Sequence, residues 1–139
     1  MIKAVIFDLD GVIVSTDDCH YEAWKKLADE EGIYFDRIIN ERLRGVSRME
    51  SLEIILEKSE RKYTEEEKTE LAQRKNGYYV KSVSELDESA VLPGAMKFVA
   101  KAKAMGLKTA IGSSSKNTNL IKQRQKSFRI GNCNIVRSN

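Results

Sequence analysis

Apolar and polar positions follow two different periods along this chain. Residues 2–7 form a short run rich in Ile, Val and Phe that stops at Asp8, a pattern typical of a buried strand. The segment "LKTAIG" from residue 107 repeats the pattern, and "CNIV" from residue 133 is a weaker third candidate. These runs predict short strands of one sheet.

Helical periodicity fills most of the chain between the first two strands. Apolar residues recur at helical spacing from residue 17 to residue 31, and Gly32 follows where a helix would end. Two further helix starts have capping-box spacing, in which a Ser or Thr is followed three residues later by Glu: Ser47 with Glu50, and Thr64 with Glu67. We therefore expect residues 17 to about 86 to be helical.

A last helix is expected after Pro93, the only proline, where apolar residues at helical spacing continue to Gly106. The order strand, helical insert, helix, strand is that of a parallel α/β core interrupted after its first strand. The predicted fold class is therefore α/β, a Rossmann-like parallel sheet, here incomplete, with an inserted all-helical cap lobe. The predicted boundaries assign residues 1–15 and 88–139 to the core and residues 16–87 to the lobe.

Composition places the chain among ordinary globular proteins, with 41% hydrophobic and 32% charged residues in a length of 139. No apolar run approaches the roughly 20 residues of a membrane helix, and the first residues do not have the pattern of a signal peptide. Cys19 and Cys133 are too few and too far apart for a disulfide framework. We expect a cytoplasmic protein with reduced thiols and no membrane partner.

Charge is divided unevenly along the chain. All 21 Asp and Glu lie within residues 1–88, beside 14 Lys and Arg, whereas residues 89–139 carry 10 Lys and Arg and no acid. Such asymmetry can indicate nucleic-acid binding. The basic residues lack the aromatic interleaving and repeated motifs of a nucleic-acid module, so no nucleic-acid partner is expected.

The stretch "FDLDG" puts two carboxylates, Asp8 and Asp10, directly after the first predicted strand. Ligands of parallel sheets bind beyond the carboxyl ends of the strands. Two close carboxylates repel each other unless a cation relieves the charge, which favours Mg²⁺, and one could attack phosphorus while the other moves a proton. A calcium loop is excluded because the apolar residues Val12 to Val14 follow; a plain polar strand end remains the alternative.

The segment "GSSSKN" follows the second predicted strand and is an independent candidate for phosphate binding. Its serines could instead simply cap a following helix.

With the helical insert between them, "FDLDGV" and "IGSSSKN" resemble the motifs of the haloacid dehalogenase superfamily. The segments "CHYEAWKKLA", "RLRGVSRMESLEIIL" and "LAQRKNGYYV" are similar to the cap of its β-phosphoglucomutase branch, so the resemblance covers about residues 1–121. It implies a phosphosugar mutase that uses Mg²⁺ and an aspartyl phosphate to interconvert β-glucose 1-phosphate and glucose 6-phosphate. Its partner would be a small phosphorylated sugar; the oligomeric state is left open.

The resemblance also implies roles for individual residues. Asp8 would be the nucleophile and Asp10 the general acid and base, with both as Mg²⁺ ligands, and Ser113 would bind the transferred phosphoryl group. In the cap, the residues implied to orient or enclose the substrate are His20, Trp24, Gly45, Val46, Ser47, Arg48 and Lys75. Those implied to hold the other phosphate are Ser114, Ser115, Lys116 and Asn117.

Each cap assignment has a purely structural alternative. A lone His20 on an amphipathic helix is as compatible with packing as with function, and Trp24 is more typical of packing. Arg48 and Lys75 could be solvated surface charges, as most basic residues are.

The chain also departs from the family pattern. The tail "QRQKSFRIGNCNIVRSN" does not resemble the family, which suggests out-of-frame translation or a divergent terminus. The lysine and the acidic pair that the family places further on have no counterpart here. Two alternative functions therefore remain, a sugar-phosphate phosphatase of the same superfamily and a non-catalytic protein that binds phosphosugars.

Overall fold

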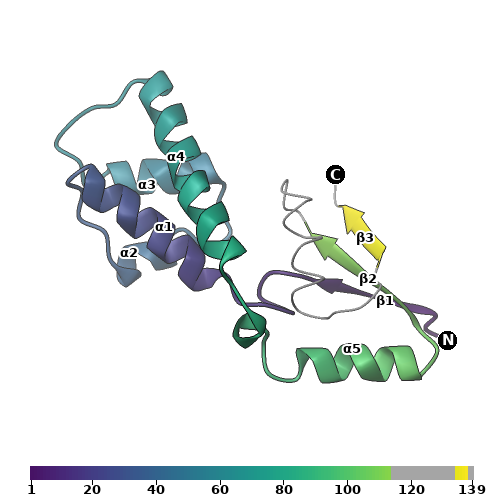
Figure 1. The fold of residues 1–139 in the computed structure, drawn as a ribbon. Helices are drawn as coiled ribbons and strands as arrows, with labels where there is room; N and C mark the ends of the chain where they lie inside the picture. The colour runs from purple at the N-terminus through teal and green to yellow at the C-terminus, as the bar shows by residue number, and fades with distance from the viewer. Residues whose placement is uncertain (114–133, 138–139) are drawn as a thin grey trace. The chain divides into compact units, whose positions relative to one another are not determined.

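The computed structural model describes residues 1–113 and 134–137. Contacts within the chain divide it into two compact units, one made of Met1–Asp17 with Ser84–Asn139 and the other of Asp18–Val83. Below, these are called the core unit and the helical unit. The elements, labelled in Figure 1, are β1 (Ala4–Asp8), α1 (Asp17–Glu30), α2 (Arg37–Glu41), α3 (Arg48–Leu56), α4 (Glu65–Ser84), η1 (Glu88–Ala90), α5 (Ala95–Ala104), β2 (Lys108–Ser113) and β3 (Asn134–Arg137).

The sheet of the core unit has the order β1-β2-β3, and both neighbouring pairs are parallel. Its register places Ala4 beside Lys108 and Asp8 beside Gly112. The carboxyl ends of β1 and β2 therefore lie at the same edge, as the predicted α/β class requires. The weak third candidate strand, "CNIV", is confirmed as β3, one residue later than predicted.

One hydrophobic cluster holds the core unit together. Leu9, Val14 and Ile111 are fully buried in it, and Val99 and Ala102 pack the inner face of α5 against them. Phe7 adds an edge-to-face contact with Phe98, with ring centroids 5.8 Å apart. Helix α5 thus packs against the sheet through the apolar face predicted from its helical spacing.

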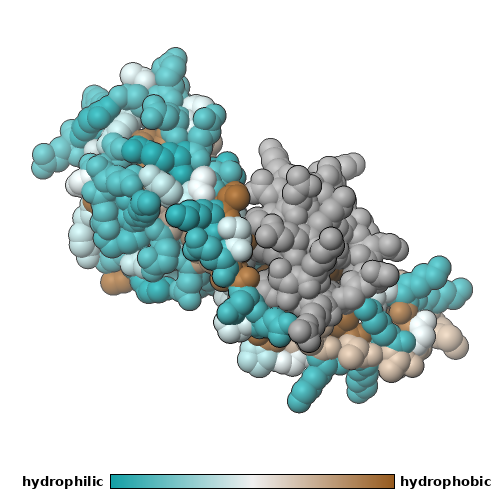
Figure 2. Space-filling model, in the orientation of Figure 1, coloured by the Kyte–Doolittle hydropathy of each residue, from teal (hydrophilic) through white to brown (hydrophobic). Residues whose placement is uncertain are grey.

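The helical unit has a separate cluster formed by all four of its helices. Its buried members are Trp24, Leu27, Ala28, Ile33, Phe35, Ile39, Leu52, Ile55, Leu71 and Ala72. Figure 2 shows mostly hydrophilic residues on the visible surface of this unit. Among the described residues, no helix is long and apolar enough to span a membrane.

The predicted helix starts are confirmed at both capping boxes. Ser47 and Glu50 exchange hydrogen bonds with each other's main chain, and Thr64 and Glu67 do the same. Two short elements were not predicted, α2 and η1, each capped by an aspartate. Each spans five residues or fewer, too few to show helical periodicity in a sequence.

Candidate functional site

Asp8 is the last residue of β1 and lies at the carboxyl edge of the sheet, beside Gly112 of β2. Its side chain is exposed, and its Oδ1 accepts a hydrogen bond of 2.7 Å from the main-chain N–H of Leu9. The buried Phe7 and Leu9 on either side anchor this point of the chain in the core. Asp8 therefore combines a fixed main chain with a carboxylate that a ligand can reach.

A tight turn after β1 positions Asp10. Gly11 has a φ of +79°, a conformation that favours glycine, and its N–H donates to Val14 O at 2.7 Å. The N–H groups of Ile13 and Val14 both donate to Leu9 O at 3.0 Å. The apolar run after the two carboxylates thus folds back into the core, while Asp10 stays half-buried at the edge.

Thr16, to which the sequence pattern gave no role, contacts one of the two candidate carboxylates. Its side chain is buried, with 2% exposed, and its hydroxyl donates to Asp10 Oδ1 at 3.1 Å. Thr16 lies six residues after Asp10, and no local sequence pattern predicts a hydrogen bond at that separation. The bond leaves the two aspartates with different surroundings, one exposed and one held by a buried hydroxyl.

The second predicted phosphate-binding segment is described only in part. Ser113 ends β2, one residue beyond the partner of Asp8, so its main chain lies at the same edge of the sheet. Ser114, Ser115, Lys116 and Asn117 lie outside the described residues.

The donor atoms near this edge suit a hard cation. Asp8 and Asp10 offer oxygen atoms, and Mg²⁺ is commonly held by one or two carboxylates together with substrate phosphate and water. Within residues 1–113 and 134–137, no group of three or more His, Cys, Asp or Glu side chains could hold a metal by itself. As far as residues 1–113 and 134–137 are concerned, the two carboxylates at this edge would suit Mg²⁺ that completes its ligands with phosphate and water.

In the helical unit, two of the predicted residues, His20 and Trp24, lie against the buried side-chain amine of a third, Lys75. Lys75 of α4 is 3% exposed, and its Nζ lies 3.0 Å from Nδ1 of His20 on α1. The amine also lies over two aromatic rings, 4.7 Å from the centre of Trp24 and 5.0 Å from that of Tyr79. The interpretation of Lys75 as a solvated surface charge is wrong, because three helical-unit side chains enclose it.

Arg48 is the first residue of α3, and its positive charge acts on the Lys75 amine. Ser47 caps this helix, and the preceding Gly45, with a φ of +75°, turns the chain into it. The Arg48 guanidinium donates through Nη2 to Asn76 Oδ1 at 2.8 Å, next to Lys75 in the sequence of α4. Burial, and then the positive charge of Arg48, lower the pKa of Lys75 to about 7.

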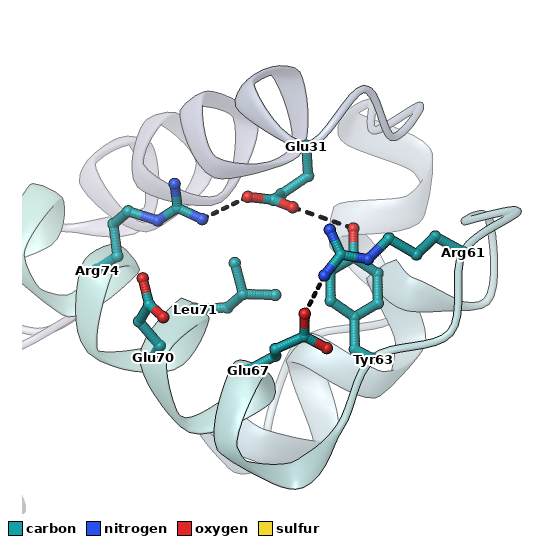
Figure 3. A pocket seen from close by; sticks show the side chains of 7 residues that line it. All are labelled: Glu31, Arg61, Tyr63, Glu67, Glu70, Leu71 and Arg74. Carbon is teal, nitrogen blue, oxygen red and sulfur yellow. Dashed lines mark hydrogen bonds and ion pairs between the residues drawn. The ribbon is translucent and has the colours of Figure 1, made fainter.

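A separate pocket of about 250 Å³ lies elsewhere in the helical unit (Figure 3), lined by Glu31, Arg61, Tyr63, Glu67, Glu70, Leu71 and Arg74. Arg74 pairs with Glu31, which also accepts a hydrogen bond of 3.1 Å from the Tyr63 hydroxyl. Arg61 pairs with Glu67. Both guanidinium groups are thus held by carboxylates, although Arg74 Nε is buried with no hydrogen-bond partner among the described residues. This pocket offers a phosphate group little free positive charge.

A parallel α/β core with carboxylates at the end of its first strand, interrupted there by a helical unit, defines the class of this protein. The chain belongs to the haloacid dehalogenase-like hydrolase family, whose sequence profile matches residues 2–129. This confirms the superfamily and the fold class that the motifs predicted.

Within that family the chain is similar to β-phosphoglucomutases. It is 47% identical, over 125 residues, to the β-phosphoglucomutase of Bacillus subtilis strain 168, with a match that covers 88% of this chain and 55% of that enzyme. A crystal structure of the β-phosphoglucomutase from Clostridium difficile superposes with a TM-score of 0.75 at 43% identity, covering 97% of this chain and 60% of that one. The chain thus spans little more than half the length of these relatives.

A phosphatase is also similar over a shorter stretch. The phosphorylated carbohydrates phosphatase of Thermotoga maritima is 36% identical over 56 residues, which cover 40% of this chain and 26% of that enzyme.

Proposed function

We propose that this chain carries the phosphoryl-transfer and substrate-binding residues of a phosphosugar mutase of the β-phosphoglucomutase type. The observation that supports this most strongly is the pair Asp8 and Asp10 at the carboxyl edge of β1, one exposed and one held by a buried hydroxyl, in a chain 47% identical to a β-phosphoglucomutase. The proposed substrates are β-glucose 1-phosphate and glucose 6-phosphate.

In the proposed reaction, an oxygen of the Asp8 carboxylate attacks the phosphorus of a sugar phosphate. The bond from phosphorus to the sugar oxygen breaks, and Asp10 delivers a proton to that departing oxygen. An aspartyl phosphate remains on Asp8. To complete the isomerisation, Asp10 removes the proton from a hydroxyl on a different carbon of the sugar, the 6-hydroxyl when the first phosphate left the 1-oxygen. That oxygen then takes the phosphoryl group as the bond from phosphorus to Asp8 breaks.

The different surroundings of the two aspartates favour this division of roles. Asp8 is exposed, so a phosphorus atom can approach its carboxylate. Asp10 is half-buried and accepts a hydrogen bond from Thr16, which orients its carboxyl group for proton transfer. Mg²⁺, held by Asp8 and by the main chain at Asp10, would neutralise charge on the phosphoryl oxygens.

The proposed roles in substrate binding belong to the helical unit and to the end of β2. Arg48 can bind a phosphate through two parallel hydrogen bonds, and Lys75 adds a second basic group close by. His20 and Trp24 hold the Lys75 amine, and Gly45, Val46 and Ser47 form the turn that presents Arg48. Ser113 is proposed to bind the transferred phosphoryl group, and Ser114, Ser115, Lys116 and Asn117 the other phosphate.

A sugar-phosphate phosphatase is the second candidate, favoured by the similarity to the Thermotoga maritima enzyme. In that reaction water, in place of a sugar hydroxyl, would take the phosphoryl group from Asp8.

Phosphorus NMR distinguishes the two candidates. The chain is incubated with β-glucose 1-phosphate and MgCl₂, with Asp8→Asn as the matched control. Formation of glucose 6-phosphate by the wild type alone supports the mutase, and release of inorganic phosphate in excess of the isomer supports the phosphatase. If the wild type forms neither product at any enzyme concentration, both proposals are wrong.

A further inference from the structure

Among residues 1–113 and 134–137, Lys75 is a buried base without an acidic partner. Its side chain is 3% exposed, yet no carboxylate among the described residues forms an ion pair with it. Lys68, two turns earlier on the same helix, shows the usual arrangement: it pairs with Glu53 at 2.7 Å and with Glu65 at 3.0 Å. A charged amine that is removed from water without a counter-ion is costly, so the surroundings of Lys75 favour its neutral form.

The groups that face the Lys75 amine come from three helices. From α1 come the imidazole of His20 and the ring of Trp24, and from α4 comes the phenol of Tyr79, which stacks on His20 with ring centres 4.1 Å apart. From α3 comes the guanidinium of Arg48, the only one of these groups that carries a permanent charge, and that charge is positive. The aromatic rings attract a cation only weakly and do not replace a counter-ion.

The side chains around the Lys75 amine interact more favourably with its neutral form than with its charged form. The amine can donate one hydrogen bond to His20 Nδ1 or accept one from it, depending on the imidazole tautomer. It also avoids repulsion with Arg48, whose guanidinium is fixed beside α4 by Asn76. The cost of the missing counter-ion would be removed by an anion that binds beside Arg48.

We propose that a substantial share of the Lys75 amine is uncharged in the free protein at neutral pH, and that this share gains a proton when a phosphate group binds beside Arg48. The helical unit thereby couples phosphate binding to proton uptake. The inference rests on the proposed function for the identity of the ligand, a sugar phosphate, but the state of the amine in the free protein does not depend on it.

The first measurement concerns the free protein. In the full chain labelled with ¹³C and ¹⁵N at lysine, the Lys75 side-chain signal, assigned by its loss in Lys75→Arg, is followed from pH 5 to pH 11. We expect a titration midpoint near 7 for Lys75, in agreement with its lowered pKa. The control Lys68, whose pKa is raised by its hydrogen bonds to Glu53 and Glu65, should stay charged through the neutral range. A Lys75 midpoint above about 9 would overturn the proposal.

The second measurement is calorimetric titration with β-glucose 1-phosphate at pH 7.5 in two buffers of different ionisation enthalpy. A pKa of about 7 leaves about three quarters of the amine uncharged at this pH, so we expect uptake of about 0.7 proton per ligand. Lys75→Arg, which is always charged, should show no such uptake, and Lys68→Arg should behave like the wild type.

The two proposals fail in different ways. Binding of the sugar phosphate with the same proton uptake in the wild type and in Lys75→Arg contradicts the coupling and leaves the proposed function intact. A Lys75 midpoint near 7 with no heat of binding contradicts the proposed function, and with it the coupling to this ligand.

Discussion

The proposed chemistry depends on two aspartates that lie two residues apart in different surroundings. Asp8 ends a strand and is exposed, whereas Asp10 follows in a glycine turn and accepts a hydrogen bond from the buried Thr16. Such a difference allows two identical side chains to perform different steps, since the accessibility and orientation of a carboxyl group depend on its neighbours.

Substitution of the two aspartates should separate their roles. Asp8→Asn should abolish covalent phosphorylation, because an amide lacks the anionic oxygen that attacks phosphorus. Asp10→Asn should keep sugar-phosphate binding and slow turnover by roughly 10²–10⁴-fold, the usual contribution of a general acid and base. Intact-protein mass spectrometry under acidic quench and steady-state kinetics give the two readouts. Equal, mild losses in both variants would contradict the assignment.

Thr16 should act on turnover through Asp10. Thr16→Val removes the hydroxyl that donates to Asp10 Oδ1 at nearly constant volume, and we expect kcat to fall about tenfold, ~1.4 kcal/mol, with little change in KM. Thr16→Ser, which keeps the hydroxyl, should recover most of the activity. A rise in KM alone, or equal losses in the two variants, would show that Thr16 acts in packing only.

At the scale of elements, the helix starts of the helical unit are fixed by side chains that bind main-chain N–H groups. Asp36 caps α2, Ser47 and Glu50 form the capping box of α3, and Thr64 and Glu67 form that of α4. The box of α3 follows directly after Gly45 and Val46 and sets the position of Arg48, so it connects helix stability with the proposed phosphate site.

Ser47→Ala should destabilise the helical unit by about 1 kcal/mol, the usual cost of losing an N-terminal cap. Urea unfolding followed by circular dichroism measures the change. Glu66→Gln is the matched control, since Glu66 lies in the first turn of α4 outside its capping box. If Ser47→Ala costs no more stability than Glu66→Gln, the capping box contributes nothing measurable.

The capping acids also predict how stability depends on pH. Hydrogen bonds lower the pKa of all three capping acids. The chief donor is Ile39 N–H for Asp36 and Ser47 for Glu50. For Glu67 it is Thr64 N–H. The folded state therefore binds fewer protons than the unfolded state around pH 4, so stability is retained above the ordinary carboxyl pKa and lost as pH falls through the lowered values. The urea midpoint should fall between pH 5 and pH 3. Glu50→Gln should show a smaller fall; an equal fall would exclude Glu50 as a contributor.

At the scale of the whole molecule, the chain has two hydrophobic clusters that share no residue. Ile111 is fully buried in the cluster of the core unit, and Leu52, 1% exposed, lies in that of the helical unit. Two separate cores predict that each unit can lose structure by itself, because the packing lost by a substitution belongs to one cluster only.

Leu52→Ala and Ile111→Ala should each destabilise their own unit by about 2–5 kcal/mol. Hydrogen exchange, measured by mass spectrometry on peptides, reports on the core unit and the helical unit separately. We expect Leu52→Ala to speed exchange in α1, α3 and α4, and Ile111→Ala to speed it in β1, β2 and α5. Faster exchange throughout the chain in both variants would show that the two units unfold as one.

The sequence alone was sufficient for the features that depend on local chemistry. Strand β1, the long helices, the two capping boxes and the α/β class were predicted, because apolar periodicity, capping spacing and glycine positions act within a few residues. The carboxylates Asp8 and Asp10 were found for the same reason, since a strand followed by paired acids is a local pattern. Family membership followed from these motifs and is confirmed by the match over residues 2–129.

Tertiary structure decided the features that join residues distant in the sequence. The hydrogen bond from Thr16 to Asp10 depends on the glycine turn, and the enclosure of Lys75 by His20 and Trp24 brings together residues about 50 positions apart. Lys75 lies on the buried face of α4, four residues from Leu71 and four from Tyr79, so helical spacing alone already places it among apolar positions; the spacing does not show which side chains enclose its amine. Whether a basic side chain is solvated or buried depends on which helices pack around it, and only the fold determines that packing and the proton affinity that results from it.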